Sequence, residues 1–148
     1  MCLMLYIGSR QGVPERATPD LSVEPVENAR LGVVRWFTQP MVQFVGAHTG
    51  CSCGFPSVVA ESVIEYYDGM WADSDDRADD LRSVAALIEL LRASLDAGQS
   101  VELYPVWDGD EGEAPKGVIQ WSLEHLAPET FFFNEQFMHV IRHADEAA

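Results

Sequence analysis

The chain has 148 residues, a length that suits one domain built around one core. Its 47% apolar and 22% charged residues are ordinary globular values, which exclude a disordered chain and a collagen-like repeat. Nine Lys and Arg against 24 Asp and Glu give a formal net charge of −15, which would repel nucleic-acid phosphates and anionic membrane surfaces. We therefore expect no nucleic acid and no membrane among the partners.

The acidic excess is confined to one part of the chain. Residues 1–55 hold four acidic residues and four arginines and are formally neutral. Residues 56–148 hold 20 acidic residues against five basic ones. Such an asymmetry indicates either a solvated, solubilising face or a surface that attracts a basic protein.

The cysteines and the apolar runs indicate a compartment. No stretch approaches the roughly 20 consecutive apolar residues that span a bilayer. The apolar run at residues 2–7 is too short for a secretory signal and has no basic leader. Three cysteines leave at least one thiol unpaired within the chain, as is usual in a reducing compartment. We therefore expect a cytoplasmic location.

The first third of the chain reads as β-rich. Residues 3–7 form a compact apolar run suited to a buried strand. Residues 21–26 alternate, but Pro25 removes a hydrogen-bond donor and restricts this segment to a sheet edge. The β-branched and aromatic content of residues 33–37 and 41–45 predicts two further strands.

Two helices are predicted next. Residues 56–68 carry apolar side chains at helical spacing, and Pro56 suits a first turn. Residues 76–97 form a longer helix that Gly98 ends. One apolar stripe runs along this second helix: Leu81, Val84, Ile88, Leu91 and Leu95. The stripe is too short for a coiled coil, so packing against a sheet is expected.

The C-terminal part reads as strands again. Residues 101–107 and 117–121 form a hairpin with an acidic tip, and residues 131–133 and 137–141 have strong strand composition. The resulting prediction is a single α+β domain over residues 1–148. It has an antiparallel or mixed sheet of about five to six strands, with two main helices packed on one face.

The reactive side chains gather in one turn between a predicted strand and a predicted helix. His48, Cys51 and Cys53 lie within six residues and are bracketed by glycines. Imidazole and thiolate are zinc ligands, and Cys2 or a distant histidine would complete a tetrahedron. Against this, the single-residue gap between the cysteines is less typical of zinc sites than a two-residue gap.

Two other interpretations of the same turn remain open. A helix beginning near Pro56 would favour the thiolate form of Cys51 and Cys53, which would then act as a redox pair or sensor. Alternatively the small residues simply allow a tight turn, in which cysteine packs as a small hydrophobic residue.

Partner binding is the leading functional hypothesis. Trp107 adjoins the acidic turn containing Asp108 and Asp110, and Asp75 and Asp76 precede the long helix. Aromatic anchors with an acidic rim are typical of protein interfaces that select a basic partner. Phosphate-binding, zinc-protease and serine-hydrolase motifs are absent from the sequence. The sequence therefore favours an interaction or regulatory module of the inhibitor or immunity type over an enzyme, with metal or thiol chemistry as the alternative.

Overall fold

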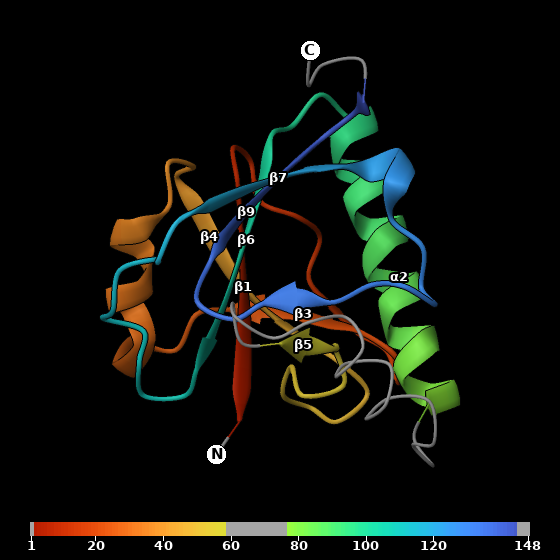
Figure 1. Cartoon of the computed structure of the whole chain (residues 1–148). Coiled ribbons are helices and arrows are strands. Elements are labelled where there is room, and N and C mark those ends of the chain that lie inside the picture. The colour runs from red at the N-terminus through yellow and green to blue at the C-terminus, as the bar shows by residue number, and fades with distance from the viewer. Residues whose placement is uncertain (1, 59–76, 145–148) are drawn as a thin grey trace.

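The computed structural model describes residues 2–58 and 77–144, and its centre is a mixed sheet of seven strands (Figure 1). The strand order is β2-β3-β4-β1-β6-β9-β7, and β5 and β8 form a separate two-stranded sheet. The strands are β1 (Leu3–Ser9), β2 (Arg16–Ala17), β3 (Ser22–Pro25), β4 (Met41–Gly46), β5 (Ser57–Val58), β6 (Val101–Trp107), β7 (Val118–Ser122), β8 (Phe133–Asn134) and β9 (Met138–Arg142). The helices are the 3-10 helices η1 (Asn28–Trp36) and η2 (Leu123–His125) and the α-helix α2 (Arg77–Asp96).

Strand β1 lies in the middle of the sheet and pairs antiparallel with β4 and β6. Tyr6 is opposite Phe44 on one side and Tyr104 on the other. The sheet is mixed because β7 pairs with β9 in parallel, whereas the other pairs are antiparallel. The predicted α+β fold with a mixed sheet is confirmed. The predicted strand count of five to six is slightly low, because the two-residue β2 lies in a segment without strand periodicity.

Side-chain alternation along the strands gives the sheet two buried faces. Leu5, Ile7 and Leu103 belong to a large core together with the apolar stripe of α2 from Val84 to Leu95. Tyr6 and Tyr104 point to the opposite face, where η1 packs on the sheet through Val33. In Figure 1, α2 and η1 accordingly lie on opposite sides of the sheet.

The long helix is confirmed as α2, and its end follows the predicted chemistry. Gly98 has a φ of +85°, in the left-handed region where glycine carries no steric penalty. Its N–H donates to the carbonyl of Leu95, and the N–H of Gln99 donates to that of Ser94. These bonds satisfy carbonyls that the helix leaves free. No helix in the described part of the chain is long and apolar enough to span a membrane.

The predicted strand at residues 33–37 is wrong, because residues 28–36 form η1. Val33 is fully buried and Trp36 packs on the same cluster, whereas Val34 between them is 36% exposed. This three-residue spacing matches one face of a 3-10 helix and not the two-residue spacing of a strand. The β-branched composition that suggested a strand is thus overridden by packing on the sheet.

The predicted helix at residues 56–68 meets the described chain only at its start. Ser57–Val58 form β5, which pairs in parallel with β8, so no helix begins at Pro56. Residues 59–68 lie outside the described residues. Of the two main helices predicted to pack on one face of the sheet, only α2 is therefore seen among the described residues.

Candidate metal centre

The turn with Cys51 and Cys53, here named the cysteine loop (residues 47–55), follows β4 and returns along the start of β1. Gly50 takes a φ of +86° at the tip of the turn, and its N–H donates to the carbonyl of Ala47. The N–H of Ala47 in turn donates to the carbonyl of Cys51 at 2.8 Å. Two backbone hydrogen bonds therefore close the loop on itself and reverse the chain.

Ser52 fastens the cysteine loop to the sheet. Its side chain is fully buried, and its N–H donates to the carbonyl of Leu3 at 3.0 Å. Its Oγ accepts a hydrogen bond from the N–H of Leu5 at 2.7 Å and donates to the carbonyl of Val45 at 2.6 Å. The loop is thus held against β1 and β4, and its two flanking cysteines have fixed positions.

Cys2 reaches the same place from the beginning of β1. Its carbonyl accepts a hydrogen bond from the N–H of Asp108 at 2.8 Å, which continues the pairing of β1 with β6 by one residue. The Sγ atoms of Cys2, Cys51 and Cys53 all lie within 4.8 Å of one another, and all three residues are free thiols. Segments about 50 residues apart in the sequence therefore form one three-sulfur cluster.

Hydrogen bonds divide the acidity of the cluster unequally. Burial alone would raise the pKa of Cys51, but hydrogen bonds from the Thr49 hydroxyl, the Cys53 N–H and the neighbouring thiols outweigh it and lower the pKa to about 7. Partial burial of Cys53 raises its pKa to about 11, and the charge of Cys51 adds to this. The Leu3 N–H, 3.2 Å from the Cys53 sulfur, opposes the rise. Near neutral pH Cys51 is therefore about half ionised, whereas Cys53 is protonated.

The sulfur spacing is close to what a metal ion requires. With a zinc–sulfur distance of about 2.3 Å and tetrahedral angles, bound sulfurs lie about 3.8 Å apart. Sulfurs up to 4.8 Å apart therefore need to approach by at most about 1 Å, which small side-chain rotations supply. Among the described residues, no histidine, aspartate or glutamate joins the three sulfurs as a fourth ligand.

A cavity of about 310 Å³ adjoins the cluster and is lined by Cys2 and Cys51. Met4, Tyr6 and Phe44, from β1 and β4, also contribute to its wall. Cys53 is not part of the lining. Two of the three cysteines of the cluster therefore line the cavity, and the third does not.

Charged side chains line the remainder of this cavity, and Arg30 is their only basic member in the described chain. Its Nη1 donates to Asp108 and, at 3.2 Å, to Glu111, while its Nε donates to Glu27 at 3.3 Å. The pKa of Arg30 is raised, chiefly by the hydrogen bond to Asp108. The Tyr6 hydroxyl donates to Glu111 at 2.9 Å, and burial followed by this bond raises the pKa of Tyr6. Carboxylates thus outnumber the single cation.

The structure brings together only some of the residues proposed as metal ligands from the sequence. Cys2, Cys51 and Cys53 meet, but His48 does not join them. The Nε2 of His48 lies 2.5 Å from Oδ1 of Asp80 in the first turn of α2, and the backbone N–H of His48 donates to the Ser83 hydroxyl. The imidazole next to the cysteines in sequence is thus engaged by the long helix.

The residues proposed for partner binding have mixed surroundings. Asp108 pairs with Arg30, and the indole Nε1 of Trp107 donates to Glu135 at 2.9 Å. Asp110 is exposed in the turn. Asp75 and Asp76 lie outside the described residues. Binding of a basic partner stays a prediction.

Sequence reasoning missed the charged wall of the cavity, which comprises Glu24, Glu27 and Arg30 together with Asp108. These residues come from β3, the start of η1 and the end of β6, and no spacing in the sequence links them. The one available signal in the sequence was that the arginines of residues 1–55 are accompanied by a large excess of acidic residues in the rest of the chain.

Comparisons with known proteins were made at three levels. No model of a known protein family matches the chain, and no similar protein was found among curated proteins or solved structures. What the cluster does must therefore be argued from its own geometry.

Proposed function

We propose that this protein binds a thiophilic divalent metal ion, zinc before others, through Cys2, Cys51 and Cys53. The observation that carries the proposal is the meeting of three free thiols within 4.8 Å from two distant segments. Thiolate is a soft ligand that selects zinc and similar ions over magnesium or calcium.

The positions of the ligands are fixed before any ion arrives. Cys51 and Cys53 flank the buried Ser52, which hydrogen-bonds to β1 and β4, and Cys2 is tied to Asp108 at the end of β6. The Leu3 N–H already donates to the Cys53 sulfur, an outer-shell contact of the kind that orients metal ligands. A site held in this way loses little conformational entropy on binding.

The charges at the site also favour a cation. Three sulfurs within 4.8 Å of one another would repel if all were ionised, and among the described residues the one cation lining the cavity, Arg30, is already engaged by carboxylates. A divalent ion would neutralise two of the three thiolate charges and would displace the protons that remain on the thiols.

A metal titration tests the proposal. The reduced protein is titrated with Co(II), a coloured substitute for zinc, and the bound Co(II) is then displaced with Zn(II). We expect one ion per chain and a thiolate-to-metal charge-transfer band. Replacing Cys2, Cys51 or Cys53 by Ser should weaken binding more than the about 10–100-fold that loss of an outer-shell partner costs.

The matched control is His48→Gln, because His48 is adjacent in sequence but contacts Asp80 and not the sulfurs. This variant should keep full stoichiometry, and its thermal unfolding is followed to verify that it is folded. Fully reduced protein that binds no stoichiometric metal would overturn the proposal, as would unchanged affinity in all three serine variants.

A specific observation also supports thiol redox chemistry as a second candidate function. The Cys51 pKa of about 7 makes its thiolate available, and two further thiols lie within 4.8 Å. Hydrogen peroxide would convert the Cys51 thiolate to a sulfenic acid and release hydroxide. A neighbouring thiol would then form the disulfide and release water. Mass spectrometry of peroxide-treated protein tests this, because disulfide formation lowers the protein mass by two hydrogen atoms. An unchanged mass would refute it.

A further inference from the structure

The cavity beside the three sulfurs has two chemically different ends. We infer that the open coordination position of the metal takes the thiolate of a small aminothiol, whose cationic nitrogen is held by the Glu24 carboxylate in the same cavity. The inference rests on the proposed metal centre and specifies what that centre binds.

The ligand set leaves a position open towards the cavity. Zinc sites with four protein ligands are closed, whereas sites with three keep a fourth position for water or substrate. The described chain supplies three sulfurs and no fourth ligand, and two of the three, Cys2 and Cys51, line the cavity. An exogenous donor would therefore enter from this side.

The soft character of the metal centre favours a sulfur donor at that position. A divalent ion with three thiolates has a net charge of −1, so it is a weak Lewis acid toward water. It remains thiophilic, and a thiol that coordinates a metal is deprotonated. On binding, the bond between metal and water and the S–H bond break, the sulfur–metal bond forms, and the proton leaves to solvent. No electrons are transferred.

The opposite wall favours a cationic group. Glu24 lies on β3 directly across from Phe44, and among the described residues it has no ion-pair partner. Glu27 also lines the cavity but is paired with Arg30, and Asp108, likewise paired with Arg30, lies beside Cys2 and not opposite it. This wall therefore attracts an ammonium group and repels a carboxylate.

The size and floor of the cavity limit the ligand to a small molecule. A volume of about 310 Å³ lies at the lower end of the range for ligand pockets, about 300–1,000 Å³. Met4, Tyr6 and Phe44 also line the cavity, with the Tyr6 and Phe44 rings 6.0 Å apart edge to face. These apolar side chains suit a short hydrocarbon link between a thiol and an ammonium group.

The test compares thiols that differ in charge but share a two-carbon chain. The protein is first loaded with one Co(II) per chain, and its visible spectrum is followed on addition of cysteamine, 2-mercaptoethanol or mercaptoacetate. Thiocholine is a fourth probe, because its quaternary nitrogen carries the charge but cannot chelate the metal. We expect the cationic thiols to bind at least about tenfold more tightly than mercaptoacetate, with 2-mercaptoethanol between them.

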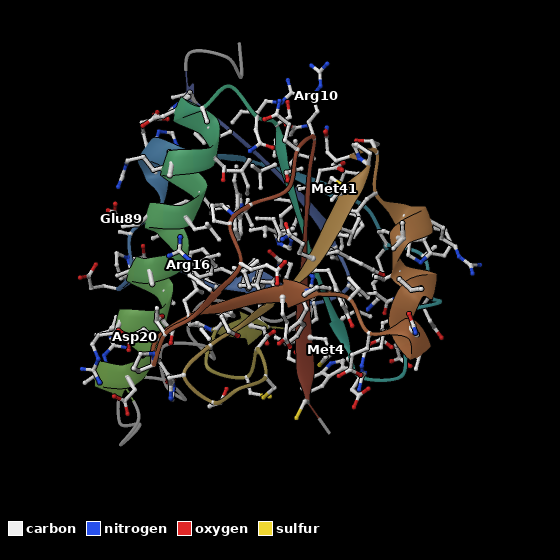
Figure 2. All side chains as sticks on the ribbon, turned by 180° about the vertical axis from the view of Figure 1, so that it is seen from behind. Met4, Arg10, Arg16, Asp20, Met41 and Glu89 are labelled. Carbon is white, nitrogen blue, oxygen red and sulfur yellow. The ribbon has the colours of Figure 1, made fainter. Side chains whose placement is uncertain are left out.

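Glu24→Gln should reduce the difference in binding affinity between thiocholine and mercaptoacetate several-fold. The matched control, Glu89→Gln, removes the same charge on α2, remote from Met4 and the cavity (Figure 2), and should leave the difference unchanged. If Co(II) does not bind, the proposed metal centre fails. If Co(II) binds but the thiols produce no spectral change, or bind without charge preference, the metal centre stands and this inference is overturned.

Discussion

Ser52→Ala tests whether the buried serine hydroxyl holds the cysteine loop in place. The substitution removes the acceptor of the Leu5 N–H and the donor to the Val45 carbonyl, at 2.7 and 2.6 Å. Ser52, Leu5 and Val45 are each fully buried, so water cannot replace these bonds. A buried polar group that loses its partner costs about 1–3 kcal/mol, so the two together should cost about 3 kcal/mol.

Urea unfolding of the metal-free protein measures this cost, and Ser94→Ala is the matched control. Ser94 is also a buried serine, but its hydroxyl only donates to the Leu90 carbonyl four residues earlier in α2. That bond is of the kind that slightly destabilises helices, and alanine is the better helix former, so its loss should cost less than about 0.5 kcal/mol. Equal effects of the two substitutions would refute the proposed role of Ser52. The Ser52 variant should also bind Co(II) more weakly.

Three further measurements follow from single side chains. Burial lowers the pKa of His139 from 6.5 to about 4. As the pH falls, the unfolded chain therefore binds the proton before the folded protein does, and the free energy of unfolding of the wild type should fall by about 3 kcal/mol between pH 6.5 and pH 4. Urea unfolding should show a shallower dependence in His139→Gln, and equal slopes would contradict this. Alkylation of Cys51 in the metal-free protein, followed by mass spectrometry, should be half-maximal near pH 7 and not near 9. Glu102→Ala removes the acceptor of the N–H groups of Thr38 and Gln39, at 2.9 and 3.1 Å, and should cost about 2 kcal/mol in urea unfolding; Glu102→Gln, which keeps one acceptor oxygen, should cost less.

Local sequence patterns were enough to predict the elements in which buried residues recur at a regular spacing. The stripe of α2 and its glycine stop were readable because each depends on neighbours within a few residues. The strand predicted at residues 33–37 was wrong because Val33 is fully buried there, while Trp36 and Phe37 pack against the cluster that β1, β4 and β6 form. Such contacts depend on sheet order, which no local pattern contains.

The candidate site shows the same division. The sequence identified the cysteine pair and named Cys2 as a ligand that would complete the set. The meeting itself depends on two facts of register: Leu5 lies opposite Val45, and Ser52 hydrogen-bonds to Leu3 and Leu5. His48 was included for its proximity in sequence, but Asp80 on α2 engages its ring.

The uneven charge of the chain acquires a meaning once the fold is known. Asp108 and Glu111 belong to the acidic part of the sequence, yet they pair with Arg30 of the neutral first third. These carboxylates engage the arginine, so its charge is already offset before a thiolate forms in the cluster. Without a metal, hydrogen bonds lower the pKa of Cys51 to about 7, whereas burial raises the pKa of Cys53 to about 11. Full ionisation requires a cation brought from outside, and this requirement favours metal binding over a free thiol pair as the function of the site.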